Sequence, residues 1–232
     1  MSRRIFALIP ARGGSKGVKR KNLAVIAGRS LLQIAISEAK STNRFDDLIV
    51  SSDAREILDA AVSLGATPLL RPIALSGDDS PADETILHFI QTHRLENDAI
   101  VVYLQPTSPL RTAEHIESAI IEFLEKTPAA LISVSAASPS LFKVFKLGVD
   151  GTLVGLNGPD APYTARQEIP ELFSPNGAIY MFSVESFMKA KRIPRVGATP
   201  FVMTERDSLD IDTPRDLHAA EVVLQKRWAA RD

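Results

Sequence analysis

Short apolar runs along this chain alternate with longer stretches in which apolar residues recur at helical spacing. The short runs are rich in β-branched residues, and they predict buried strands at residues 5–9, 47–52, 67–70, 99–104, 130–134 and 176–182. The longer stretches predict helices at about residues 31–39, 53–62, 80–90 and 112–125, and one more that begins at 213–214. Strands that alternate with helices indicate βαβ units, and therefore an α/β fold with a mostly parallel sheet and helices on both faces.

Two of the helix starts carry polar signals. Ser30 stands where the first helix begins, and Asp53 is followed three residues later by Glu56, which is the spacing of a capping box. A side-chain oxygen at such a position accepts a hydrogen bond from a backbone N–H of the first helical turn. We therefore expect Ser30 and Asp53 to cap their helices.

The regular alternation stops between residues 138 and 174. Short mixed segments there are separated by glycine and proline, and the α/β pattern returns at residues 176–182. The interruption predicts an inserted hairpin or arm at about residues 138–174. We find no internal repeat, so we expect residues 1–232 to form a single domain that carries this arm.

Composition and charge narrow the classes of function. The sequence is 45% hydrophobic and 24% charged, as is usual for a globular protein, and 27 basic residues balance 28 acidic ones. A net charge of −1 argues against binding to nucleic acid, and the absence of cysteine excludes disulfides, thiolate metal sites and cysteine nucleophiles. With no signal peptide and no apolar stretch long enough to span a bilayer, we expect a cytoplasmic protein that does not bind membranes.

A basic, glycine-rich loop follows the first predicted strand. Residues 12–22 contain three glycines and five cations. Glycine lets backbone N–H groups approach a ligand closely, and Arg and Lys supply the positive charge that a polyanion needs. At the carboxyl end of a buried strand this composition predicts a phosphate-binding site, although the spacing is not that of a Walker A loop. The alternative is a solvated basic surface loop.

The same loop contains the spacing G-x-S-x-G around Ser15, which is the nucleophile elbow of serine hydrolases. That motif needs a helix directly after the turn, but residues 18–21 have no apolar period, and the late histidine His218 lies in a predicted helix. We therefore consider the match accidental. A serine hydrolase would lose its activity with Ser15→Ala and keep it with Asp210→Ala.

Asp210 and Asp212 form the best candidate for a metal site. In an extended segment, residues two apart point to the same side, so both carboxylates can bind one hard cation. Mg²⁺ is commonly held by one or two carboxylates together with substrate phosphates. The alternative is helix capping, because acidic residues just before 213–214 favour a helix N-terminus. Given a phosphate loop elsewhere in the chain, we favour the metal.

Four motifs occur in the order in which one enzyme family has them. They are Pro10-Ala11-Arg12-Gly13-Gly14-Ser15-Lys16-Gly17 with Lys21-Asn22, Leu104-Gln105-Pro106-Thr107-Ser108-Pro109-Leu110-Arg111, Pro175-Asn176-Gly177-Ala178-Ile179-Tyr180 and Asp210-Ile211-Asp212-Thr213. On these motifs, which extend over almost the whole chain, the sequence resembles the acylneuraminate cytidylyltransferases (CMP-sialic acid synthetases), including the legionaminic and pseudaminic acid enzymes. The resemblance implies a three-layer nucleotidyltransferase fold, and a homodimer in which the inserted arm reaches toward the partner's site.

The resemblance also implies the ligands and the residues that hold them. CTP would be bound by the basic loop and by two later loops, through Ala11, Arg12, Gly13, Ser15, Lys16, Lys21, Asn22, Arg71 and Ser80. The sugar acid would be bound by the loop after the fourth strand and by the arm, through Gln105, Lys143, Arg166 and Gln167. Mg²⁺ would be held by the acidic pair, Asp210 and Asp212. The catalytic residues would be Arg12, Lys21 and Asp212.

The implied reaction is attack of the sugar's anomeric hydroxyl on the α-phosphorus of CTP, with release of pyrophosphate. Positioning and charge neutralisation would supply most of the rate enhancement. The substrate would be a nonulosonic (sialic-type) acid, whose identity the sequence leaves open. The nearest alternative is the same chemistry on the shorter acid Kdo, and a further alternative is a protein that binds CTP without catalysis.

Overall fold

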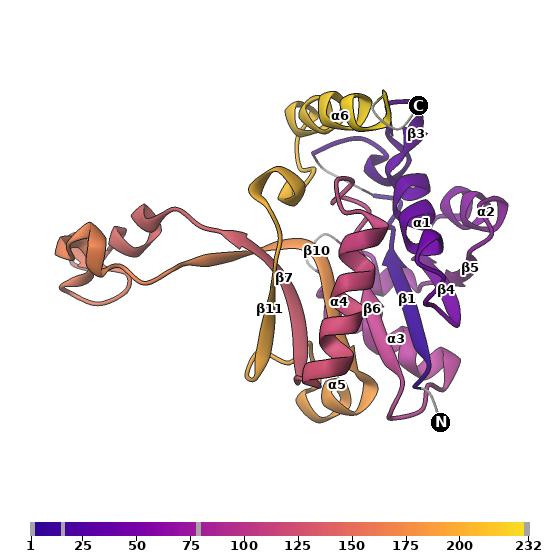
Figure 1. The fold of residues 1–232 in the computed structure, drawn as a ribbon, viewed down its shortest axis with the longest axis horizontal. Helices are drawn as coiled ribbons and strands as arrows, with labels where there is room; N and C mark the ends of the chain where they lie inside the picture. The colour runs from indigo at the N-terminus through magenta and orange to yellow at the C-terminus, as the bar shows by residue number, and fades with distance from the viewer. Residues whose placement is uncertain (1–2, 15–16, 78–79, 230–232) are drawn as a thin grey trace.

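A seven-stranded sheet forms the centre of the protein, in the order β11-β7-β10-β6-β1-β4-β5 (Figure 1). The computed structural model describes residues 3–14, 17–77 and 80–229. β10 runs antiparallel to both of its neighbours, and every other adjacent pair in this sheet is parallel, which confirms the predicted mostly parallel α/β fold. The strands are β1 (Ile5–Pro10), β4 (Asp47–Ser52), β5 (Thr67–Leu70), β6 (Ile100–Tyr103), β7 (Ala130–Ala136), β10 (Phe173–Ser183) and β11 (Ala198–Val202).

Helices cover both faces of this sheet and give three layers. They are α1 (Leu31–Ser41), α2 (Arg55–Ser63), α3 (Ala82–His93), α4 (Ala113–Lys126), α5 (Val184–Ala190) and α6 (Pro214–Ala229). α1, α2 and α4 pack on one face, α3 and α5 pack on the other, and α6 packs beside α1 in a smaller apolar cluster. The alternation along β1 explains the two cores, because Ala7 and Ile9 point to the first face whereas Phe6 and Leu8 point to the second. Among the described residues, no helix is both long and apolar enough to cross a membrane.

The segment predicted as an arm extends away from the sheet (Figure 1). It leaves the body at the end of β7 and returns through the start of β10, where Ala136 and Phe173 are paired. Apolar side chains of its hairpin are exposed, with Leu147 at 74% and Leu153 at 67%. The arm contains β8 (Phe145–Leu147), β9 (Leu153–Gly155) and three 3-10 turns, η3 (Pro139–Lys143), η4 (Ala161–Tyr163) and η5 (Arg166–Glu168).

Three small features have no clear signal in the sequence. α5 is only seven residues long, and the side chains of β11 are half-buried or exposed, so neither shows a sustained apolar period. A hairpin of two-residue strands, β2 (Val25–Ile26) and β3 (Arg29–Ser30), lies just before α1. Short elements of this kind are fixed by their tertiary contacts, which local spacing does not reveal.

The two predicted helix caps have different outcomes. Ser30 does cap α1, because its hydroxyl accepts a 3.1 Å hydrogen bond from the backbone N–H of Gln33. The prediction for Asp53 is wrong, since α2 is preceded by Ala54 and has no side-chain cap. The Asp53 carboxylate instead accepts a 2.9 Å hydrogen bond from the backbone N–H of Gly13, in the loop after β1. The carboxylate of Asp53 therefore bonds to a distant segment of the chain and not to the helix that follows it.

Arg111 is a buried cation that fastens the loop after β6 to the sheet. It is 2% exposed, and its Nη1 donates to the carbonyl oxygen of Gln105 at 3.0 Å and to that of Ala178 at 2.7 Å. Burial lowers the pKa of the guanidinium to about 10, which still leaves it charged at neutral pH. Arg111 therefore sets the position of the β6 loop relative to β10.

We expect Arg111→Met to lower the free energy of unfolding by about 2–4 kcal/mol, because buried carbonyl oxygens lose their donor. Arg44→Met is the matched control. Arg44 forms an exposed ion pair with Glu117 at 2.6 Å, whose loss should cost less than about 1 kcal/mol. Urea unfolding followed by circular dichroism gives both values, and equal costs for the two variants would contradict the role given to Arg111.

Candidate active site

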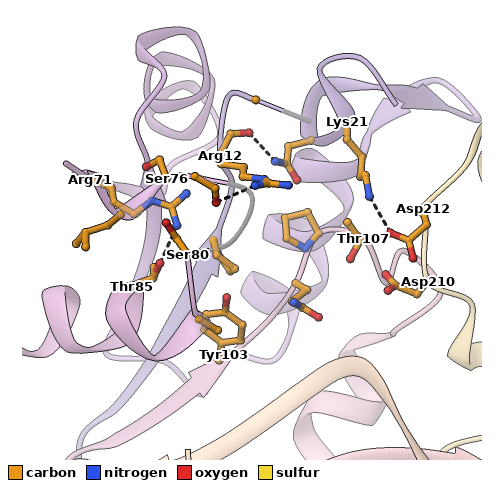
Figure 2. Close-up of a pocket in the computed structure, with 18 residues that line it drawn as sticks. Arg12, Lys21, Arg71, Ser76, Ser80, Thr85, Tyr103, Thr107, Asp210 and Asp212 are labelled. Atoms are coloured by element: carbon orange, nitrogen blue, oxygen red, sulfur yellow. Dashed lines mark hydrogen bonds and ion pairs between the residues drawn. The ribbon is translucent and has the colours of Figure 1, made fainter. Parts of the chain in front are cut away.

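A cavity of about 330 Å³ opens at the carboxyl ends of β1 and β6 (Figure 2). Parallel strands end at the same edge of a sheet, so loops that are distant in the sequence meet there. Eight of the predicted site residues line it, namely Arg12, Lys21, Asn22, Arg71, Ser80, Gln105, Asp210 and Asp212. Several other lining residues were not predicted as site residues, among them Ser76, Thr85, Tyr103 and Thr107.

The described part of the loop after β1 is fixed by hydrogen bonds. Arg12 donates through Nη1 to the carbonyl oxygen of Gly77 at 2.9 Å, and the Asn22 side chain donates to the carbonyl oxygen of Arg12 at the same distance. Gly13 leaves no room for a side chain, because an added Cβ would lie 2.7 Å from the Cβ of Ala54. The close packing at Gly13 holds the start of the loop against the start of α2.

Not every residue predicted in this loop lines the cavity. Ala11 is buried, and the backbone N–H of Gly13 is already bonded to Asp53, so both shape the loop without lining the cavity. Ser15 and Lys16 lie outside the described residues. Their predicted roles stay predictions.

Arg71 supplies a buried cation at the opposite end of the cavity from Lys21 (Figure 2). It is 6% exposed, and its Nη1 donates to Oγ1 of Thr85 at 2.8 Å. Burial lowers the pKa of Arg71, an effect that the charge of Asp53 opposes. Within the described part of the chain, Nε and Nη2 have no hydrogen-bond partner. Two buried, unused donors beside a cavity indicate that a ligand supplies the acceptors.

Lys21 joins the first loop to the acidic segment near the end of the chain. Its Nζ donates to the carbonyl oxygen of Ile211 at 2.7 Å and lies 3.1 Å from Oδ1 of Asp212. The carboxylate of Asp210 accepts a hydrogen bond from the side chain of Thr107. Removal of part of its surface from water raises the pKa of Asp210, and the neighbouring Asp212 carboxylate raises it further, while Thr107 and Lys21 act in the other direction.

The acidic pair fits a divalent cation that also binds phosphate. The two carboxylates repel each other, and the ammonium of Lys21 offsets only one negative charge. Among the described residues, no third carboxylate or histidine joins the pair. Mg²⁺ bound here would therefore keep water or substrate oxygens as its other ligands, as it commonly does. Helix capping, the alternative role, falls to Thr213 and Asp216, since Oγ1 of Thr213 accepts from the N–H of Asp216 at 3.4 Å and Oδ2 of Asp216 accepts from the N–H of Thr213 at 2.7 Å.

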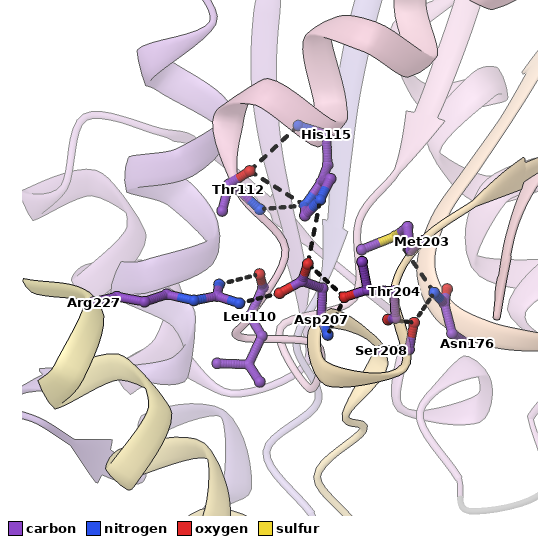
Figure 3. Close-up of polar contacts among 9 residues, drawn as sticks. All are labelled: Leu110, Thr112, His115, Asn176, Met203, Thr204, Asp207, Ser208 and Arg227. Carbon is purple, nitrogen blue, oxygen red and sulfur yellow. Dashed lines mark hydrogen bonds and ion pairs between the residues drawn. The ribbon is translucent and has the colours of Figure 1, made fainter.

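A second polar cluster lies around Asp207, just before the acidic segment (Figure 3). Asp207, in the turn η6 (Glu205–Ser208), forms an ion pair with Arg227 of α6, and its Oδ2 lies 3.7 Å from Nε2 of His115 in α4. Arg227 also donates to the carbonyl oxygen of Leu110 at 2.9 Å. Burial lowers the pKa of His115, so the ring is mostly uncharged at neutral pH. The cluster connects the acidic segment with the β6 loop and with two helices.

The motif at residues 175–180 forms a bulge that supports Gln105. The pairing of β10 with β7 changes register between Pro175 and Tyr180. Inside the bulge, Gly177 has a φ of +76°, and an added Cβ there would lie 2.7 Å from Oε1 of Gln105. Glycine is favoured at this position by its backbone conformation, and a Cβ there would also displace the side-chain amide of Gln105.

The predicted sugar-binding residues of the arm do not reach this cavity within one chain. Lys143 and Arg166 line a separate cavity of about 290 Å³ on the arm, and Gln167 lies in η5 beside Arg166. Of the sugar-binding candidates, the structure brings only Gln105 to the cavity at the sheet edge. The roles of Lys143, Arg166 and Gln167 remain predictions.

Comparisons with known proteins agree with this geometry. Residues 6–227 match the family described as cytidylyltransferase. The N-acylneuraminate cytidylyltransferase of Escherichia coli O18:K1:H7 is 31% identical, over 98% of this chain and 54% of its own length. This chain spans about half the length of curated relatives of that type. The CMP-N,N'-diacetyllegionaminic acid synthase of Legionella pneumophila is also 31% identical, over 96% of this chain and 97% of its own.

The fold has solved counterparts as well. The structure of CMP:2-keto-3-deoxy-manno-octonic acid synthetase complexed with CTP superposes with a TM-score of 0.74, over 97% of this chain and 99% of its own. At 16% identity, this similarity concerns the fold alone. The family match over nearly the whole length, together with relatives of the kind that the four motifs suggested, confirms the resemblance, and the chain belongs to the cytidylyltransferase family.

Proposed function

We propose that this protein transfers the CMP group of CTP to a nonulosonic (sialic-type) acid and releases pyrophosphate. The observation that carries the proposal is a single cavity in which Arg12, Lys21 and Arg71 surround a space bordered by Asp210 and Asp212. Cations beside a glycine-rich loop suit a triphosphate, and a carboxylate pair suits its Mg²⁺ ion. Membership of the cytidylyltransferase family and the names of the relatives support the same chemistry.

In this proposal the triphosphate lies along Arg12 and Lys21, and the base lies at Arg71. The two unused N–H donors of Arg71 suit the adjacent carbonyl oxygen and ring nitrogen of cytosine, which are both acceptors. Uracil carries an N–H at that ring position and would oppose one of the two donors. The contact with Thr85 fixes the guanidinium, so little ordering is needed when the base binds.

The proposed reaction forms a bond from the sugar's anomeric oxygen to the α-phosphorus and breaks the bond to the pyrophosphate oxygen. The hydroxyl proton is released to solvent. Arg12 and Lys21 would offset charge on the phosphate oxygens as the leaving group departs. Asp210 and Asp212 would hold Mg²⁺, which when bound supplies Lewis-acid polarisation of those oxygens.

The relatives favour a nonulosonic acid over the shorter acid Kdo. Enzymes named for N-acylneuraminate and for N,N'-diacetyllegionaminic acid are 31% identical to this chain, whereas the structure of the CMP-Kdo type shares 16%. The serine hydrolase alternative lacks the helix that should follow Ser15. A 3-10 turn, η1 (Lys21–Leu23), comes next in the described chain, and α1 begins at Leu31.

We further propose that two copies of the chain form a homodimer through the arm. The arm exposes apolar side chains on both strands of its hairpin, including Leu147 and Leu153. A second copy that covers this surface would let Lys143 and Arg166 meet the sugar acid in the partner's cavity. We also propose a cytoplasmic location, as expected from the sequence.

We expect pyrophosphate release from CTP and Mg²⁺ with at least one acid in a panel of nonulosonic acids. Asp212→Ala should lower the rate about 10²–10³-fold, because a charged group at the phosphates is lost. Asp98→Ala is the control, since Asp98 is exposed in the loop before β6, at the far edge of the sheet. A coupled assay for pyrophosphate measures all three proteins.

The same panel separates the alternatives. If no nonulosonic acid gives pyrophosphate release although the protein binds CTP, the proposed sugar substrate is wrong. Pyrophosphate release with Kdo alone would favour an enzyme of the Kdo type. Loss of activity in Ser15→Ala combined with full activity in Asp210→Ala would favour the hydrolase.

A mixed dimer tests whether the arm acts on the partner's site. Lys143→Ala and Asp212→Ala should each be nearly inactive. A heterodimer of the two variants has one site that combines an intact Asp212 with an intact Lys143 from the other chain, so it should recover about half of the wild-type activity. Two affinity tags allow its purification. A heterodimer as inactive as its parents would mean that the arm does not act across the dimer.

A further inference from the structure

Tyr103 is a buried residue of the cavity to which the proposed reaction assigns no role. It ends β6, where it pairs with Leu8 of β1 and with Tyr180 of β10, and it is 4% exposed. Its ring meets that of Tyr180 edge to face, with centroids 6.2 Å apart and planes at 70°. Neighbouring strands on both sides and the aromatic contact hold the ring in place.

The hydroxyl of Tyr103 is placed where a ligand in the cavity can meet it. Figure 2 shows it directed into the cavity, below the space between Arg12 and Arg71. In the described part of the chain, no group forms a hydrogen bond with it. Burial raises the pKa of the phenol well above its ordinary value, so at neutral pH the group is an uncharged O–H donor. A tyrosine hydroxyl that faces a cavity bonds to water when the site is empty, and it can exchange that water for an oxygen of a bound ligand.

The position of the hydroxyl between the cations indicates which part of a nucleotide it meets. With the phosphates at Arg12 and Lys21 and the base at Arg71, the ribose must span the space between them, above Tyr103 (Figure 2). A neutral O–H suits a ribose hydroxyl, whereas phosphate oxygens gain more from the neighbouring cations. Burial raises the pKa of the phenol, and the nearby charge of Arg71 acts in the opposite direction, which makes the O–H a stronger hydrogen-bond donor than burial alone would.

We propose that the Tyr103 hydroxyl donates a hydrogen bond to a ribose hydroxyl oxygen of bound CTP, and so makes the site select ribonucleotides. The inference rests on the proposed function, because it requires that CTP occupies this cavity. It adds a specificity-determining residue that comes from an apolar strand and not from any of the four motifs.

The experiment measures equilibrium binding of CTP, 2'-deoxy-CTP and 3'-deoxy-CTP by calorimetry, with no sugar acid present. Wild-type protein should bind one deoxy analogue about 3- to 10-fold more weakly than CTP. Tyr103→Phe should bind CTP more weakly by that factor and bind the same analogue as wild type does. Tyr180→Phe, which removes the hydroxyl of the other ring in the pair, should keep the wild-type ratio of CTP to analogue. Thermal unfolding checks that each variant is folded.

Several results would overturn the inference. Wild-type protein that binds CTP and both analogues equally would exclude ribose selection. Tyr103→Phe that keeps the full wild-type preference for CTP would exclude Tyr103 as its source. Failure of the wild-type protein to bind CTP at all would refute the proposed function itself, and that result is obtained without any variant.

Discussion

The bridge from Lys21 to the acidic segment is the contact on which the rest of the site depends. Nζ of Lys21 bonds to Ile211 and Asp212, which lie 190 and 191 residues further along the chain. Gly17 packs so closely on the carbonyl oxygen of Asp212 that any side chain there would clash. The loop after β1 and the segment before α6 form two walls of the cavity, so the bridge also sets its width. One ammonium group thus fixes the geometry and reduces the repulsion between two carboxylates.

The cations of the cavity differ in how many of their hydrogen-bond donors are already bonded to other residues. Arg71 is almost fully buried, and among the described residues Thr85 alone bonds to its guanidinium, so Nε and Nη2 remain for a ligand. Lys21 is already paired with Asp212, and a phosphate must compete with that carboxylate for it. A group that matches Arg71 therefore gains more on binding than one that displaces an existing pair. The end of the cavity at Arg71 is therefore suited to distinguishing one ligand group from another. At the other end, Lys21 can exchange its contact with Asp212 for a contact with a phosphate.

Much of the fold and of the site could be predicted from the sequence, because the apolar period indicates the main strands and helices and the motifs indicate the loops that follow them. The buried runs predict the main strands, and parallel topology brings their following loops to one edge. Asp53 was misassigned because a capping box is a local pattern, whereas the N–H of Gly13 reaches it through the fold. Tyr103 ends an apolar strand and reads as core, although its hydroxyl faces the cavity. The general rule that residues at strand ends serve ligands is the signal that could have found it.

The structure of the arm could not be predicted in this way, because its short elements have no apolar period. The exposed apolar side chains of its hairpin are not explained by packing within the described part of the chain. Its attachment has a consequence for how such proteins change over time. The arm enters and leaves through the adjacent strands β7 and β10, which are paired at Ala136 and Phe173. Insertions, deletions or exchange of residues 138–172 therefore leave the register of the sheet untouched. Changes confined to the arm can therefore alter the proposed dimer contact and the sugar-binding residues without a change in the nucleotide-binding loops.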